Sequence, residues 1–262
     1  MRRIFRHLCI AAAAFAVSTA FGQDVVSLVK KAQNGDAAAQ CNLGLCYASG
    51  EGVPQNQEEA VKWFRLAAEQ GFAMAQCTLG ACYLEGKGVP QNQTEAVKWL
   101  KLAADQGLAM AQAALGSCYA IGQGVPQNQT EAVKYFKLAA EQGDADAQHE
   151  LGNHYFIGEG VPQNREEAVK WYRLAAAQGD AMAQCALGIC YATGQSVPQN
   201  QTEAVKYFKL AADQGYAMAQ FYLGLCYKYG QGVPQNRAEA AKWLKLAADQ
   251  GFEDASNELK DL

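Results

Sequence analysis

"GVPQNQTEAVKYFKLAAEQG" occupies residues 124–143, and nearly the same line recurs at residues 88–107 and 196–215. Its proline belongs to a series with a constant spacing of 36 residues, each member followed by Gln-Asn: Pro54, Pro90, Pro126, Pro162, Pro198 and Pro234. A period of this length is typical of a solenoid, in which stacked helical units bury a shared core. Six such units fill residues 35–250, so there is no room for a second globular domain.

The second half of each unit predicts a helix. Asn56 and Glu59 form an Asn-x-x-Glu capping box, in which the Asn side chain accepts from the backbone three residues on and the Glu reaches back to the Asn N–H. Apolar residues such as Val61 and Phe64 follow at helical spacing, and Gly71 ends the segment. The same signals recur in all six units, so we expect six equivalent second helices.

The first half of each unit predicts another helix, over about residues 37–48 in the first unit. Ala39, Leu43 and Tyr47 lie on one face of it. A glycine stands in the middle, Gly44 in the first unit, and it costs about 1 kcal/mol relative to Ala in a helix interior. We therefore expect a neighbouring helix to approach closely at this glycine.

The pattern of residues 39–71 resembles the Sel-1-like repeat, a relative of the tetratricopeptide repeat, and the resemblance covers residues 35–262. It implies an all-α fold, a right-handed α-solenoid of six 36-residue helix-turn-helix repeats, and a role as an adaptor in protein complexes. Ser196 departs from the pattern, because the other units have Gly there. The expected organisation is a signal peptide at 1–22, an N-terminal capping helix at 23–34, repeats at 35–70, 71–106, 107–142, 143–178, 179–214 and 215–250, and a partial repeat at 251–262.

The N-terminus predicts export. Arg2, Arg3 and Arg6 precede an apolar stretch at residues 8–17, which gives way to small residues, the order of a secretory signal. The stretch is too short for a membrane span, which needs about 18 residues or more. We expect an exported protein, periplasmic or secreted, without an integral membrane span.

The charge of the chain argues against a nucleic-acid partner. Without the three N-terminal arginines, 19 basic residues face 26 acidic ones, a net charge of −7. Nucleic-acid phosphates require clustered Lys and Arg side chains.

Eight cysteines follow the signal segment, and an even number in an exported protein raises the possibility of disulfides. Cys41 and Cys46 are five residues apart in one helix, which places their Cα atoms beyond the roughly 7 Å that a disulfide tolerates. Equivalent cysteines in successive units are expected about 8 to 10 Å apart, which is also too far. We expect unbridged thiols that fill space in the core.

His149 and His154 occupy the columns of Cys41 and Cys46, three units later. One column therefore reads Cys46, Cys82, Cys118, His154, Cys190 and Cys226, which invites a metal interpretation. The spacing between packed helices makes a four-ligand cluster hard to close, so we predict no metal and no cofactor. "HELGNH" at 149–154 has one residue too many for a zinc-protease motif, and "SLVK" at 27–30 lacks the companion motifs of penicillin-binding enzymes.

A partner is expected on the concave surface that successive first helices would build. The residues that point away from the Leu43-type core position vary between units and are mostly apolar, and methionines flank them at positions 74, 110, 182 and 218. The predicted partner-binding residues are Leu45, Cys77, Leu84, Ser117, His149, Asn153, Phe156, Ile189, Phe221, Leu225 and Lys228. Two alternatives stay open: burial of this row between helices, and pairing with a second copy in a homo-oligomer.

The leading functional hypothesis is an exported protein–protein interaction scaffold that binds a protein or peptide in the groove. No catalytic constellation is found, so we predict that the protein is not an enzyme. Weak β-lactam hydrolysis involving Ser27, by analogy with secreted cysteine-rich relatives, is one alternative. A thiol or histidine metal or redox sensor is the other.

Overall fold

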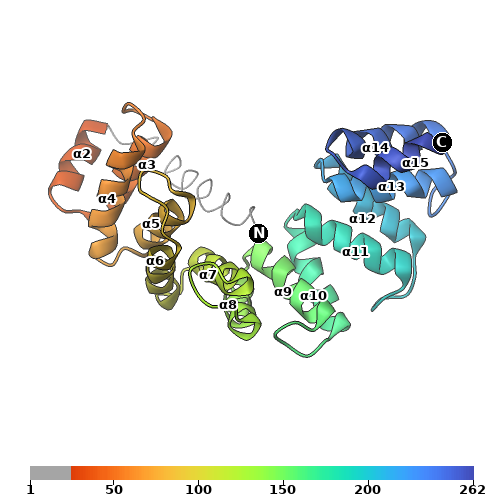
Figure 1. Ribbon diagram of the computed structural model, residues 1–262, viewed down its shortest axis with the longest axis horizontal. Helices are drawn as coiled ribbons and strands as arrows, with labels where there is room; N and C mark the ends of the chain where they lie inside the picture. The colour runs from red at the N-terminus through yellow and green to blue at the C-terminus, as the bar shows by residue number, and fades with distance from the viewer. Residues whose placement is uncertain (1–24) are drawn as a thin grey trace. The chain divides into compact units, whose positions relative to one another are not determined.

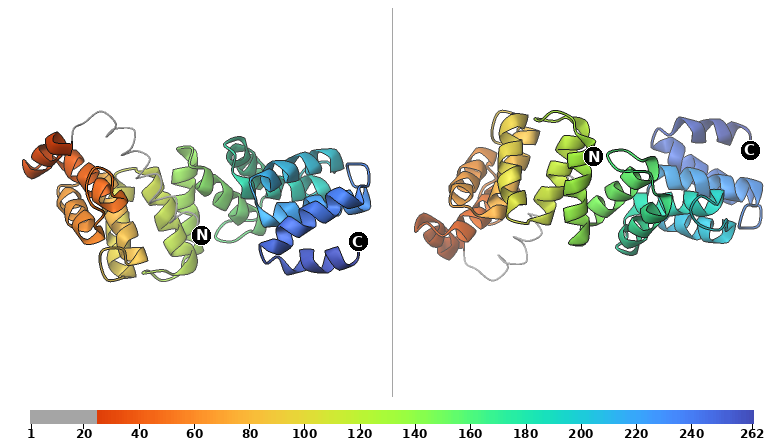
Figure 2. Two further views of the ribbon diagram at one scale, coloured as in Figure 1. Left: turned by 90° about the horizontal axis from the view of Figure 1, so that it is seen from above. Right: turned by 90° about the horizontal axis from the view of Figure 1, so that it is seen from below.

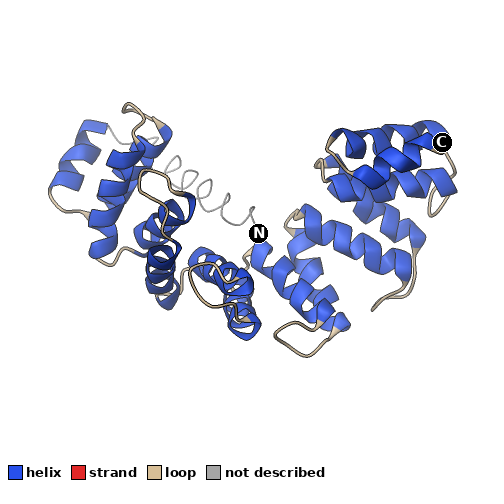
Figure 3. Ribbon diagram, viewed as in Figure 1, coloured by secondary structure: helices blue, strands red, loops and turns tan. Residues whose placement is uncertain are grey.

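The computed structural model describes residues 25–262, and every regular element among them is an α-helix (Figure 3). The segment expected to be a signal peptide lies outside the described residues. The first helices of the repeats, here called A helices, are α3 (Ala37–Ser49), α5 (Ala73–Glu85), α7 (Ala109–Ile121), α9 (Ala145–Ile157), α11 (Ala181–Thr193) and α13 (Ala217–Tyr229). The second, or B, helices are α4 (Gln57–Glu69), α6 (Gln93–Asp105), α8 (Gln129–Glu141), α10 (Arg165–Ala177), α12 (Gln201–Asp213) and α14 (Arg237–Asp249). Helix α2 (Val25–Gln33) precedes the array and α15 (Glu253–Lys260) follows it.

Within each unit, each A helix packs against its own B helix, and each B helix packs against the helix that follows it in the same unit. This stacking confirms the predicted all-α solenoid of helix-turn-helix repeats (Figures 1 and 2). The contacts divide the chain into two units, with the boundary after Asp144, and each unit is described by itself below. Unit 1 contains α2 to α8, and unit 2 contains α9 to α15.

The capping prediction for the B helices is half right. Asn56 Oδ1 accepts from the backbone N–H of Glu59 at 3.1 Å, as expected. The backbone N–H of Asn56, however, donates to the carbonyl of Tyr47 in the A helix at 2.8 Å, and the Glu59 carboxylate pairs with Lys62 instead. The tight A–B turn places a carbonyl from the last turn of α3 at the Asn N–H, so the glutamate is not needed there.

The mid-helix glycine marks close packing between the two helices of a repeat, as predicted. A Cβ atom built on Gly44 would lie 2.6 Å from Cε1 of Phe64 in α4, well inside van der Waals contact. The equivalent glycine in the second repeat, Gly80, faces Leu100 in the same way at 2.8 Å. The helical cost of each glycine is therefore offset by burial of a large apolar side chain against its backbone.

A glutamine pair lies inside each repeat and, within each unit, at the contact of the repeat with the preceding helix. Gln40 of α3 is buried, and its Nε2 donates to the carbonyl of Ala32 in the preceding helix at 3.1 Å. Gln70, just after α4, donates in turn to Gln40 Oε1 at 2.7 Å. The same side-chain pair occurs in every repeat, with distances of 2.7 to 2.9 Å. Inside each unit, these junctions thus satisfy a buried amide and a carbonyl at a helix end.

The A–B turn of the fifth repeat differs from the others. Ser196 is the one non-glycine residue with positive φ in the described chain, at 70°, and its Oγ is buried without a hydrogen-bond partner. At the equivalent Gly88, a Cβ would collide with the carbonyl of Gln57 in the preceding B helix. This turn position therefore favours glycine, because φ is positive and there is little room for a Cβ atom.

No helix in residues 25–262 has the length and apolar character that crossing a bilayer requires.

Candidate functional site

Helix α3 has neighbours on three sides, namely α2, α4 and the following repeat, so only a narrow strip of it faces solvent. Helix α3 meets its own B helix at Gly44. Cys46 belongs to a buried cluster with Leu28 of the preceding helix, whereas Cys41 and Leu45 belong to another cluster with residues of the following repeat. Cys41 and Leu45 of α3 therefore face the next repeat.

The predicted partner-binding residues lie mainly on this inter-repeat side. Five are buried: Leu45, Cys77, Leu84, Ser117 and His149. Six are half-buried, all in unit 2: Asn153, Phe156, Ile189, Phe221, Leu225 and Lys228. Cys77 and Leu84, for example, pack in one cluster with Leu115 of the following A helix. Direct partner contact by the buried members stays a prediction.

Helix α15 and the preceding Phe252 pack against three of the predicted residues at the end of unit 2, and these three remain half-buried. The ring of Phe221 lies 5.0 Å from the ring of Phe252, centroid to centroid. Leu225 packs in the same cluster. Lys228 Nζ forms an ion pair with Glu258 at 2.7 Å, and it also donates to the Glu258 carbonyl at 3.2 Å. These side chains stack the partial last repeat onto α13.

Another row of residues on the A helices, next to the inter-repeat side, is accessible to solvent. The second, sixth, ninth and thirteenth residues of each A helix share one side of it, and in α9, α11 and α13 all of them are half-buried or exposed. At the sixth and ninth positions of α5 and α7 in unit 1, the residues are buried. We call the accessible row in unit 2 the unit-2 stripe: Asp146, Glu150, Asn153, Ile157, Met182, Ala186, Ile189, Thr193, Met218, Tyr222, Leu225 and Tyr229.

Sequence reasoning found only the column of Asn153, Ile189 and Leu225 in this stripe. It assumed that the side opposite the core residue faces solvent, which holds for a helix with one neighbour and fails for a helix with three. The methionine column, Met182 and Met218 here, was noted only as flanking the groove. Its repetition at the second helix position was the signal that could have identified the accessible row.

The unit-2 stripe is mostly apolar with an acidic end. Met182 and Met218 are flexible, polarisable side chains that adapt to different partner shapes. Ile157 and Tyr229 are 65% and 57% exposed. Asp146 and Glu150, both on α9, bring carboxylates to the end of the stripe that lies in the fourth repeat. Such a surface can hold a peptide with apolar anchors and a basic residue at one end.

A polar cluster lies at this acidic end. Tyr172 donates its hydroxyl proton to Asn153 Oδ1 at 2.8 Å, and Asn153 Nδ2 lies 3.3 Å from His149 Nε2. His149 Nδ1 is buried without a hydrogen-bond partner, 3.9 Å from Glu150 Oε1. Burial raises the pKa of Tyr172 well above its usual range, so its hydroxyl stays a donor. Two neighbours thus hold Asn153 in one orientation on the stripe.

His154 makes a hydrogen bond that stabilises its own repeat. Its Nδ1 lies 2.8 Å from the carbonyl of Glu159, and it must donate, because a carbonyl oxygen only accepts. The ring therefore ties the end of α9 to the A–B turn of its repeat.

The cysteines are packing residues. All eight in the described chain are buried and form no disulfide. Burial raises the pKa of the Cys41, Cys118 and Cys185 thiols to about 12, so they stay protonated at neutral pH. The thiolate is the form that reacts and binds metals. Among residues 25–262, no group of three or more His, Cys, Asp and Glu residues is arranged to hold a metal ion.

Ser27 and Lys30, the pair behind the hydrolase alternative, are both exposed on α2. A serine nucleophile needs an adjacent base and a site that shields the reaction from water. The exposed face of a helix provides no such shielding.

The sequence profile of the Sel1 repeat matches six consecutive stretches: residues 37–72, 73–108, 109–144, 145–180, 181–216 and 217–252. The chain belongs to the Sel1 repeat family. Each matched Sel1 repeat begins with its A helix, two residues after the boundaries expected from the proline spacing. Sel1 repeat proteins are generally protein–protein interaction scaffolds.

Solved Sel1 repeat structures resemble this one. A protective antigen present in uropathogenic Escherichia coli strains, which displays an SLR fold, is 37% identical over 91% of this chain, with a TM-score of 0.84. The present chain spans only 51% of that protein. A Sel1 repeat protein from Oxalobacter formigenes is 34% identical over 90% of this chain and 96% of its own, with a TM-score of 0.77. No curated protein matches the sequence significantly.

Proposed function

We propose that this Sel1 repeat protein is an exported scaffold that binds a protein or peptide along the A helices, with the unit-2 stripe as its contact surface. The observation that carries the proposal is the row of half-buried apolar side chains on α11 and α13, including Met182, Ile189 and Met218. Hydrophobic side chains at this spacing suit a partner that inserts apolar anchors.

The acidic end of the stripe gives the bound segment a direction. Asp146 and Glu150 are on α9, whereas the corresponding positions of α11 and α13 are occupied by Met182, Ala186 and other uncharged residues. A basic residue of the partner would therefore lie against α9, and its apolar anchors would follow toward α13. Charge pairs of this kind fix register and partner choice more than they add affinity.

Export is the part of this proposal that rests on the N-terminal sequence. Arg2, Arg3 and Arg6 followed by the apolar residues 8–17 support it. Fractionation of cells that express the full chain tests it. Recovery of the full-length protein in the cytoplasm alone would contradict export.

Selection of random peptides displayed on phage against the purified protein tests the stripe. We expect enriched peptides to combine apolar residues with Arg or Lys, and to lose binding to the variants Ile189→Asp and Met218→Asp. The variant Thr202→Asp is the matched control, because Thr202 is exposed in the first turn of a B helix, where an acidic residue is favoured. The proposal fails if no peptide is enriched, or if the stripe variants bind as well as the control.

A further inference from the structure

The B helices carry a second, separate set of exposed apolar side chains. One leucine in each B helix is between 40% and 49% exposed: Leu66, Leu102, Leu138, Leu174, Leu210 and Leu246. Single exposed leucines are common on protein surfaces. Six at the same position of six repeats form a recurrent feature of this face.

A basic residue precedes each of these leucines: Arg65, Lys101, Lys137, Arg173, Lys209 and Lys245. Within the described chain, only Lys137 has a carboxylate within 4.0 Å, that of Glu141 at 3.9 Å. Arg65 donates to the hydroxyl of Tyr83 at 2.7 Å and Arg173 to that of Tyr191 at 3.2 Å, and both acceptors are neutral. These contacts orient the guanidinium groups without neutralising them.

The other basic column of the B helices behaves differently. Lys62 and its equivalents each pair with the glutamate three residues earlier, at 2.8 to 3.6 Å. One basic residue per B helix is thus neutralised within its own helix, whereas the one beside the exposed leucine is not, with Lys137 of α8 as the exception. The chain itself provides a comparison between a paired and an unpaired cation on the same surface.

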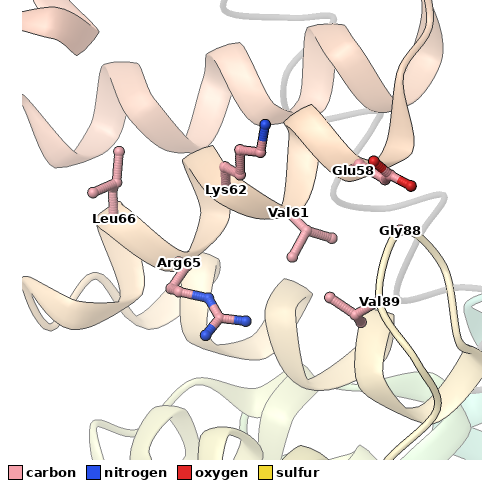
Figure 4. Close-up of a pocket in the computed structure, with 7 residues that line it drawn as sticks. All are labelled: Glu58, Val61, Lys62, Arg65, Leu66, Gly88 and Val89. Carbon is pink, nitrogen blue, oxygen red and sulfur yellow. The ribbon is translucent and has the colours of Figure 1, made fainter.

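A pocket of about 470 Å³ lies beside Arg65 and Leu66, between α4 and the turn before α6. Val61 and Val89 face each other in it, and the Arg65 guanidinium lies on their side of α4 (Figure 4). Lys62 and Leu66 also line the pocket, although their side chains point to the other side of α4. The pocket joins an apolar floor to an unpaired cation.

We infer that α4 and α6 of unit 1 form a docking surface for an acidic peptide segment in which a leucine-like side chain stands beside a carboxylate. The apolar side chain enters the pocket next to Val61 and Val89, and the carboxylate pairs with Arg65. On α6, the exposed Leu102 stands next in sequence to Lys101, which has no carboxylate of the described residues within 4.0 Å, and this position receives the next such pair of the segment. This surface lies on the B helices and does not depend on the unit-2 stripe.

The acidic residues nearby fix the orientation of the segment and argue against a membrane surface as the occupant. Glu58 lines the opposite end of the pocket from Arg65, so the carboxylate of the partner must lie at the Arg65 end. Glu69 and Asp105, one helical turn after Arg65 and Lys101, are exposed and would repel a continuous layer of anionic lipid headgroups. A single segment can place its carboxylates between them.

Fluorescence anisotropy with three synthetic peptides tests the inference. The probe is a labelled peptide of three Glu-Glu-Leu triplets, compared with matched peptides of three Glu-Glu-Ser and three Lys-Lys-Leu triplets. We expect the full-length protein to bind only the first, and a rise in NaCl from about 50 to about 500 mM to weaken that binding. The chain is acidic as a whole, so a carboxylate-rich peptide gains attraction only at locally unpaired cations.

The decisive variant is the double substitution Arg65→Gln with Lys101→Gln, which should weaken binding about fivefold. Its control is Lys30→Gln with Lys31→Gln, an equal loss of charge from exposed residues of α2, which should leave binding unchanged. All four residues are exposed, and circular dichroism melting checks that both variants fold. Absence of binding, equal losses in both variants, or equal binding of the Lys-Lys-Leu peptide would overturn the inference. So would binding to phosphatidylglycerol vesicles, but not to the peptide, that is lost in the Arg65/Lys101 variant.

Discussion

At the scale of single residues, the repeats show which side chains the fold requires. Asn56 caps its helix as the sequence predicts, but its backbone N–H is satisfied by Tyr47 rather than by Glu59. The spacing of Asn and Glu is equally compatible with both arrangements. Only the position of the preceding helix decides between them, and that position is a tertiary property.

Ser196 is the residue that fits its repeat least well, and replacement by glycine should stabilise the protein. We expect Ser196→Gly to raise the free energy of unfolding by about 1 kcal/mol, because positive φ is unfavourable for any residue with a Cβ. Urea unfolding followed by circular dichroism measures the change. The reverse substitution at the equivalent turn, Gly124→Ser, should destabilise, since its Cβ would collide with the carbonyl of Gln93. Equal stability of Ser196→Gly and the unmodified protein would show that the turn carries no strain.

At the scale of helices, the sequence predicts the elements well and their exposed faces less well. The proline period, the Asn caps and the mid-helix Gly44 column specify the helices and the A–B contact inside a repeat. The sequence did not reveal which sides of α3 and α5 contact the neighbouring repeats, because these helices are apolar on all sides. The predicted partner-binding residues of unit 1 are buried, which was one of the two alternatives that the sequence left open.

The glutamine pairs were missed for a related reason. Gln40 and Gln70 recur at fixed positions of every repeat, but polar residues near helix ends are usually interpreted as solvent-exposed. Their 36-residue recurrence, in columns that no capping or turn rule explains, was the available signal. A buried glutamine in an apolar helix has to find partners, and the preceding repeat provides them.

Loss of one glutamine pair should weaken the junction between two repeats. In the variant Gln112→Leu, the hydrogen bonds to the Ala104 carbonyl and from Gln142 disappear, and we expect a loss of about 1 to 2 kcal/mol. The matched control is Gln127→Leu, because Gln127 is exposed and makes one side-chain bond, to the Ala120 carbonyl. Its effect should stay within about 0.5 kcal/mol. Similar unfolding midpoints for the two variants would contradict a stabilising role for the pair.

At the scale of the whole molecule, buried cysteine thiols occur in the cores of both units. Cys41 and Cys118 are in unit 1, and Cys185, Cys190 and Cys226 are in unit 2. Burial raises the pKa of the last two to about 11 and that of the other three to about 12. An unfolded chain would ionise the same thiols near pH 8.5.

Stability should therefore fall as the pH rises above about 8.5. Between the unfolded and folded pKa values, the unfolded chain binds fewer protons than the folded one, so the free energy of unfolding decreases with pH. The contribution is fully present below the unfolded pKa and is lost toward about pH 12. Urea unfolding at about pH 8 and about pH 10 measures the slope. The variant Cys118→Ala with Cys185→Ala should show a shallower slope, whereas an identical slope would exclude the thiols as its cause.

The glutamine pair described above also bears on how such a chain changes length. At the junctions inside each unit, the same glutamine amide donates to the same helix-end carbonyl, so the start of one repeat matches the end of another. An in-frame duplication or deletion of one whole repeat would create no new kind of junction. Unequal recombination between the near-identical stretches at residues 88–107, 124–143 and 196–215 would then yield folded relatives that differ by whole repeats.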